Sequence, residues 1–290
     1  MKIITELKSR NIGKYNTDGI IFSYEKYNTI AGIEFKLDEV KSVVESIHSL
    51  KKLAILKIDK IIEEDEVEEL YNFLDFILSY NIDYYLFTDM SVLNYFKTKK
   101  MENRLIYSAK TLNCSYNDCA YYNAQGIKVM LSNELTLDDI ENISTLPNIV
   151  LDGYGYSNIF YSKRKLLSLF KEAKSLPNNI TNKSYTITEQ NRNENYPIYE
   201  NENGTFIFTS YKYLFFKELE KVQNLFMFKI ESLFIDEDAL IEVIDIYKNA
   251  ISEGITEEGY NRLIEIDKNV GHSFLYKKPL ILRGDDNEKN

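Results

Sequence analysis

The sequence predicts an α/β fold in which parallel strands close into a βα barrel of the TIM-like type. Over the first 150 residues, short apolar or aromatic runs alternate with longer runs of helical period, as they do in chains of parallel βα units. Six strands can be counted there, and six such strands fit a barrel better than a two-layer sandwich. The count does not reach eight, which leaves an incomplete or distorted barrel open.

Each expected strand is rich in β-branched and aromatic residues, and each expected helix is an amphipathic run between two strands. Thr136 precedes Asp138 and Asp139, as is typical of a capped helix start. The strands are expected at residues 19–24, 53–59, 83–89, 104–109, 127–134 and 148–156, and the helices at residues 37–50, 64–80, 111–124 and 136–144.

The pattern changes after a helix that begins near Lys163. Residues 175–204 are polar and rich in Asn, but two stretches within them alternate with period two. This alternation predicts a small β excursion around residues 180–205 rather than a linker. Later elements are expected as strands at residues 204–210 and 225–231 and as helices around 211–223, 236–253 and 256–268. We therefore expect one barrel domain over residues 1–282 and a disordered tail over residues 283–290.

Composition narrows the function classes. The 290-residue chain has a formal net charge of −10, whereas free-standing nucleic-acid binders usually carry a basic field. Binding to DNA is therefore not expected. The N-terminal segment lacks the apolar core of a signal peptide, and no run approaches the length that spans a bilayer. We expect a cytoplasmic protein without a membrane partner.

The chain is poor in metal ligands and in nucleophile–base combinations. Its two cysteines, Cys114 and Cys119, are not spaced as a metal motif, and there are only two histidines, His48 and His272. Reduced structural thiols and no metal site are expected. Ser157 lies in half of a nucleophile elbow, without the second glycine or a nearby histidine.

In a βα barrel the functional site lies at the C-terminal ends of the strands. Lys229 and Glu231 are two residues apart at one such end, so their side chains share a face. Either they form a structural salt-bridge layer inside the barrel or they contact a substrate or cofactor. We expect Asp89 to cap a helix. Catalytic residues are not identified, and the weak candidates are Lys229, Glu231 and Glu134.

The segment "GYSNIFYSKRKLLS", residues 155–168, resembles the signature segment of peptidase family U-32, the collagenase-like protease family. The positions that agree with it are Gly155, Ser162, Arg164, Leu167 and Ser168. Four other segments resemble stretches of the family in the same order, so that the resemblance runs from about residue 20 to residue 280. They are residues 57–74, 127–140, 192–214 and 228–234.

The resemblance also implies a departure from the family. Members with modification roles carry four cysteines that look set to hold an iron–sulfur cluster. Asn158 and Lys165 stand at the first two of these positions, and no cysteine follows Cys119. No cofactor is therefore expected. Other departures from the family pattern are Val150, Ser232 and Leu233.

The chain resembles the short, cysteine-poor members that are matched with a longer chain in hydroxylation of the tRNA wobble uridine. The resemblance therefore implies an accessory or divergent subunit, with a second, longer family chain and tRNA as partners. Two alternatives stay open: a collagenase-like protease acting on peptides, and a small-molecule barrel that binds a carboxylate through Lys229 and Arg192.

The basic turn at Ser162, Lys163, Arg164 and Lys165 is a candidate for binding RNA or substrate, together with Arg192. The alternative is a helix start whose cations face only water.

Overall fold

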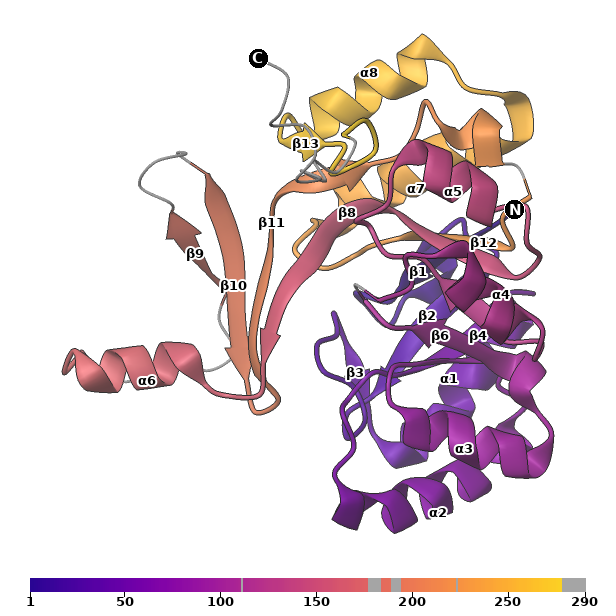
Figure 1. Ribbon diagram of the computed structural model, residues 1–290, viewed down its shortest axis with the longest axis vertical. Coiled ribbons are helices and arrows are strands. Elements are labelled where there is room, and N and C mark those ends of the chain that lie inside the picture. Colours follow the sequence, from indigo (N-terminus) through magenta and orange to yellow (C-terminus); the bar gives the residue numbers. More distant parts are fainter. Residues whose placement is uncertain (111, 177–183, 189–193, 223, 278–290) are drawn as a thin grey trace, which may run out of the picture.

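The computed structural model describes residues 1–110, 112–176, 184–188, 194–222 and 224–277 (Figure 1). Eight parallel strands follow one another around a closed barrel, and the last strand pairs with both the first and the seventh. The predicted βα barrel is confirmed, and it is complete. Its strands are β1 (Lys2–Glu6), β2 (Gly19–Tyr24), β4 (Leu53–Ile58), β5 (Tyr84–Phe87), β6 (Leu105–Ser108), β7 (Lys128–Met130), β8 (Ile149–Ser162) and β12 (Met227–Ile230).

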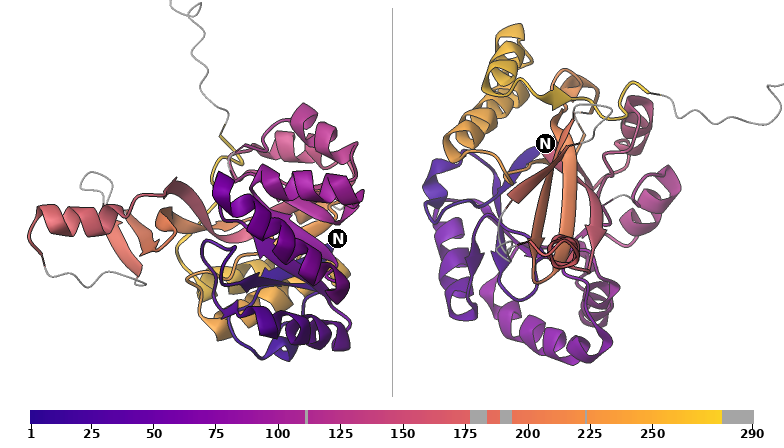
Figure 2. Two further views of the ribbon diagram at one scale, coloured as in Figure 1. Left: turned by 90° about the horizontal axis from the view of Figure 1, so that it is seen from below. Right: turned by 90° about the vertical axis from the view of Figure 1, so that its left-hand side faces the viewer.

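Helices surround the barrel, as the view along the arm shows (Figure 2, right). Their apolar sides pack on the outward faces of the strands and form the larger core. They are α1 (Leu37–Ser49), α2 (Val67–Ile77), α3 (Met90–Lys99), α4 (Tyr116–Asn123), α5 (Leu137–Ile143), α7 (Glu237–Glu253) and α8 (Glu257–Ile266). Short 3₁₀ helices occupy Ile12–Lys14, Glu64–Glu66, Leu78–Tyr80, Glu102–Arg104 and Leu219–Val222, and two short strands are β3 (Glu34–Phe35) and β13 (Val270–Gly271).

A second, smaller core fills the barrel interior. Each strand contributes one apolar side chain to it, because alternate residues of a strand point to opposite faces. The eight are Ile4, Ile21, Ile55, Leu86, Ile106, Met130, Val150 and Met227.

Two residues further along each strand, the inward position is polar in every case. We call these eight residues the polar layer: Glu6, Ser23, Lys57, Thr88, Ser108, Ser132, Asp152 and Lys229. The interior thus changes from apolar to polar at the C-terminal ends of the strands, where βα barrels carry their sites.

An antiparallel arm extends from the barrel (Figure 1). It is formed by the long β8 together with β11 (Gly204–Leu214), β10 (Asn195–Asn201) and β9 (Ser184–Thr188). Helix α6 (Leu166–Ala173) lies at its far end. The β excursion expected around residues 180–205 is confirmed, and β8 and β11 connect it to the barrel.

The helix expected around residues 211–223 is wrong. Strand β11 continues to Leu214, and only Leu219–Val222 turn into a 3₁₀ helix. The reason is that Lys212 and Tyr213 pair with β8 on one side and with β13 on the other, which fixes an extended backbone. Strand β1 lies in a segment for which no strand was expected.

The tail over residues 283–290 lies outside the described residues. Among the residues that are described, no helix has the length and apolar character needed to cross a bilayer.

Candidate functional site

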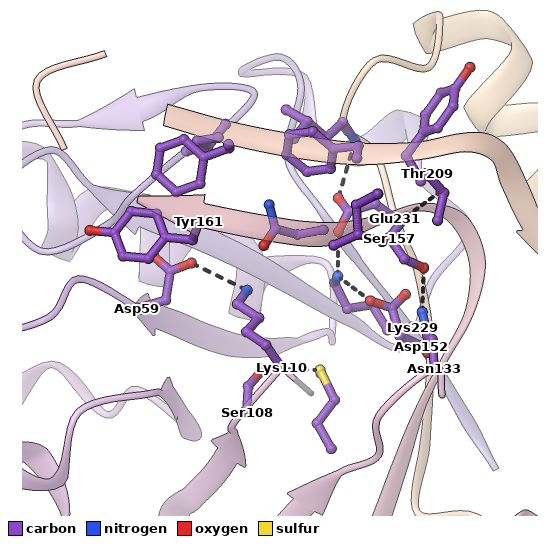
Figure 3. Close-up of a pocket in the computed structure, with 18 of the residues that line it drawn as sticks. Asp59, Ser108, Lys110, Asn133, Asp152, Ser157, Tyr161, Thr209, Lys229 and Glu231 are labelled. Carbon is purple, nitrogen blue, oxygen red and sulfur yellow. Dashed lines mark hydrogen bonds and ion pairs between the residues drawn. The ribbon is translucent and has the colours of Figure 1, made fainter. Parts of the chain in front are cut away.

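A cavity of about 490 Å³ lies between the polar layer and the inner face of the arm (Figure 3). Seven of the eight polar-layer residues line it, and Ser23 is the exception. The arm supplies the opposite wall with aromatic side chains of β8 and β11, among them Tyr161, Phe206 and Phe208. The cavity therefore has a charged floor and an aromatic wall.

Lys229 is held between two carboxylates on the floor. Its Nζ lies 3.0 Å from Oδ2 of Asp152 and 2.5 Å from Oε2 of Glu231 (Figure 3). The backbone N–H groups of Ser232 and Leu233 donate to Oε1 of Glu231 at 2.8 and 3.1 Å. The sequence placed Lys229 and Glu231 on one face, and the structure brings them into contact; Asp152 completes the group.

Burial and these contacts shift the pKa of each member of the group. Burial opposes the charge of Glu231, but Lys229 more than offsets this and lowers the pKa of Glu231 to about 2. Burial also opposes the charge of Lys229, and the two carboxylates raise its pKa well above the usual range. Burial raises the pKa of Asp152, because Lys229 compensates for it only in part.

A second ion pair lies beside the first. Nζ of Lys57 donates to Oε1 and Oε2 of Glu6 at 2.7 and 2.9 Å and also to the carbonyl of Ile30. Sequence reasoning missed Lys57, Glu6 and Asp152. The signal that could have found them is a polar residue two positions after an apolar strand residue, repeated on strand after strand.

Asp59 and Lys110, which follow β4 and β6, form a third pair that lines the cavity. Asp59 is 5% exposed and accepts hydrogen bonds from the N–H and the hydroxyl of Thr29, both at 2.8 Å. Nζ of Lys110 lies 3.7 Å from its Oδ2. Burial opposes the charge of Asp59, but Lys57, Lys110 and Thr29 lower its pKa, so that the carboxyl is ionised.

Asp89 is a helix cap, as predicted. Its Oδ1 accepts hydrogen bonds from the N–H and the hydroxyl of Ser91 at the start of α3. Its Oδ2 accepts one from the N–H of Ile62. Asp89 is not among the residues that line the cavity.

The remaining catalytic candidates do not form a nucleophile–base or carboxyl pair. Glu134 is exposed at the cavity edge, whereas the oxygens of Glu231 are bound by Lys229 and by backbone N–H groups. The hydroxyl of Ser157 receives a hydrogen bond of 2.5 Å from Nδ2 of Asn133. An amide N–H is a donor and cannot accept the hydroxyl proton.

The basic turn follows the cavity wall, at the far end of β8. Lys163, Arg164 and Lys165 are exposed, and Lys163 pairs with Glu63. The first N–H groups of α6 are not available to a ligand, because the buried Glu200 accepts hydrogen bonds from Leu167 and Ser168. An anion at the basic turn would therefore be bound by side chains rather than by the start of α6. The other predicted contact, Arg192, lies outside the described residues.

The two residues at which the resemblance places the first cluster cysteines, Asn158 and Lys165, supply no ligand for an iron–sulfur cluster. Nδ2 of Asn158 donates to the carbonyls of Phe160 and Ile207, and Lys165 is exposed at the start of α6. Neither side chain supplies a thiolate. Among the described residues, no three His, Cys, Asp or Glu side chains are grouped so that they could hold a metal ion.

Three comparisons place the chain among known proteins. The family model described as peptidase family U32 matches residues 8–275. The chain is 27% identical over 236 residues to tRNA hydroxylation protein P2 of Bacillus subtilis (strain 168), covering 78% of this chain and 76% of that protein. The structure of the U32 peptidase Mk0906 resembles it with a TM-score of 0.50 and 12% identity, covering 80% of this chain and 92% of that one. At that identity the structural likeness shows the fold alone.

Proposed function

Because the chain belongs to peptidase family U32, we propose that it acts in tRNA modification, as an accessory or divergent subunit in hydroxylation of the wobble uridine. The observation that supports this most is its similarity to tRNA hydroxylation protein P2, which covers about three quarters of both chains. The family model spans residues 8–275, which include the arm and every barrel strand except β1.

We further propose that this chain works without an iron–sulfur cluster. Asn158 and Lys165 stand at two of the ligand positions, and the only cysteines of the sequence, Cys114 and Cys119, lie elsewhere. Burial raises the pKa of the Cys119 thiol to about 12, which disfavours a thiolate ligand. A second, longer family chain would then supply the cluster, and this chain would contribute its cavity or its arm.

The basic turn is the proposed contact for the phosphate backbone of tRNA. In the described part of the chain, Lys163 pairs with Glu63, but neither Arg164 nor Lys165 forms an ion pair. Both cations are exposed and can approach a phosphate without first breaking a contact. The net charge of −10 implies that the partner chain supplies most of the basic surface.

A peptidase activity has less support. It would need an activated nucleophile, a metal-bound water or a pair of carboxyl groups that share a proton. Ser157 faces an amide, and Glu134 and Glu231 make no contact with each other among the residues described.

The test is mass spectrometry of tRNA nucleosides from a strain that lacks the gene, compared with its parent. We expect hydroxylated wobble uridine to fall several-fold and to return when the gene is restored. Restoration with Arg164→Glu/Lys165→Glu should be incomplete, whereas Lys97→Glu, an exposed change on α3, should restore it fully. An unchanged nucleoside profile in the deletion strain would contradict the proposal.

A further inference from the structure

The cavity carries more negative than positive groups. Four carboxylates, Glu6, Asp59, Asp152 and Glu231, face three ammonium groups, Lys57, Lys110 and Lys229. Glu134 and Glu194 add two carboxylates to the lining. The formal charge around a ligand is therefore negative, which disfavours a second negative charge in a partly buried space.

Two of the three cations in the cavity are held by buried carboxylates, and the third, Lys110, lies 3.7 Å from Asp59 with 48% of its side chain exposed. Lys57 uses its three donors on the two oxygens of Glu6 and the carbonyl of Ile30. Lys229 lies between Asp152 and Glu231. A ligand carboxylate that took the place of Glu6, Asp152 or Glu231 on these two ammonium groups would leave a buried carboxylate without its partner.

Acceptors, in contrast, are open to a ligand. Within the described part of the chain, Oδ1 of Asp152 accepts no hydrogen bond, and the Asp152 side chain is 21% exposed in the cavity. The hydroxyl of Ser108 is buried, and its one partner among the described residues is the sulfur of Met130, at 3.5 Å. A thioether is a weak acceptor, so this hydroxyl is also available.

The arm offers flat apolar faces opposite these acceptors. The rings of Tyr161 and Phe206 stack with centroids 4.8 Å apart and an interplanar angle of 23°. Phe208 meets Phe234 edge to face at 5.0 Å. Tyr161, Phe206 and Phe208 all line the cavity, and such surfaces bind planar rings.

We propose that the cavity binds a flat ring that carries N–H donors and no negative charge, and that it rejects carboxylates. The ring would lie against the aromatic side chains of the arm, and its N–H groups would donate to Asp152 and to the floor of the barrel. Figure 3 shows Asp152 and Tyr161, which both line this space. This ligand class covers a base of RNA and a free heterocyclic metabolite. It differs from the carboxylate of the small-molecule alternative, which would bind through Lys229 and Arg192. The inference does not depend on a role in tRNA modification.

The test compares three probes that share one ring and differ in charge. Benzamide is neutral, benzamidinium is positive and benzoate is negative, and binding to the full chain is measured by calorimetry at neutral pH and low salt. We expect benzamide and benzamidinium to bind at least tenfold more tightly than benzoate. Equal or tighter binding of benzoate would overturn the inference, as would failure of benzamide and benzamidinium to bind at millimolar concentration.

Variants that change the charge of the cavity test whether charge, rather than shape alone, sets the ligand preference. Asp59→Asn keeps the size of the side chain and removes one negative charge, so benzamidinium should bind several-fold more weakly and benzoate more tightly. Asp75→Asn, at an exposed ion pair with Lys99 outside the cavity, is the matched control. If Asp59→Asn does not fold, Lys110→Gln is the alternative. It removes a positive charge from the cavity and should therefore strengthen binding of benzamidinium.

Competition identifies the source of the ring. Uridine should displace benzamide if the natural ligand is a base, whereas displacement by neither uridine nor cytidine would point to a free metabolite. A binding result that contradicts the charge preference would leave the tRNA nucleoside profile of the deletion strain unaffected, so the two proposals can fail separately.

Discussion

Nζ of Lys229 lies 2.5 Å from Oε2 of Glu231, two residues along the same chain and at the C-terminal end of β12. Both side chains point into the barrel, where 9% and 16% of their surfaces are exposed. Asp152 approaches the same ammonium from β8 at 3.0 Å. One cation therefore joins the two neighbouring strands, β12 and β8, across the cavity floor.

Replacing Lys229 with Met should destabilise the fold by about 3 kcal/mol or more, because two buried carboxylates lose their common partner. Urea denaturation at pH 7 would measure the free energy of unfolding. Lys217→Met removes an exposed pair with Glu257 and should change the free energy of unfolding far less than Lys229→Met does. If both variants lost a similar free energy of unfolding, the buried contacts of Lys229 would stabilise the fold no more than an exposed ion pair does.

Replacing Glu231 with Gln should lower the free energy of unfolding near neutral pH and leave it nearly unchanged in acid. The pKa of Glu231 in the folded chain, about 2, lies below its ordinary value of 4.5. Its ionisation therefore stabilises the fold above about pH 4.5, and this contribution is lost as the pH falls toward 2. Burial raises the pKa of Asp152 and Glu6, so their ionisation opposes folding as the pH rises.

The measurement for Glu231→Gln is the difference in unfolding free energy from the unmodified chain between pH 2 and pH 7. The difference should be largest near neutral pH and shrink at the acid end. Glu265→Gln, an exposed pair with Arg262, serves as the control and should give a small difference at every pH. A pH-independent loss for Glu231→Gln would contradict the assignment.

Replacing Glu200 with Gln should loosen the arm but not the barrel. The carboxylate of Glu200 accepts hydrogen bonds from the N–H groups of Leu167 and Ser168 and from the hydroxyl of Thr205. Losing the charge should cost about 1–2 kcal/mol locally. Hydrogen exchange should therefore become faster in α6 and in β10 and β11, and not in the barrel strands. The exposed Glu202→Gln should leave exchange unchanged.

The two cysteines should differ in reactivity. Cys114 is exposed, whereas Cys119 is buried in α4 and has a pKa raised to about 12 by that burial. The thiolate is the reactive form, so a thiol reagent at pH 8 should modify the exposed Cys114 rapidly. Cys119 should react only when the protein unfolds. Two equally fast thiols would contradict the burial of α4 against the barrel.

Much of the fold could be predicted from local pattern. Strand β2 was expected with its observed bounds, and α1 and α7 were expected to within a residue, because period and capping residues act within a few positions. Strand β1 was not expected, although shorter barrel strands such as β7 were. The helix expected around residues 211–223 was wrong because pairing with β8 and β13 overrode local preference. Local sequence carries little information about such pairing.

By itself the sequence determined the alternation of strands and helices, the family resemblance and the shared face of Lys229 and Glu231. Only the tertiary structure decided which charges meet. Asp152 reaches Lys229 across 77 residues, and Glu6 reaches Lys57 across 51. These contacts exist because the closed barrel turns one position of every strand toward a common axis. Closure depends on all eight strands at once, and no local pattern specifies it.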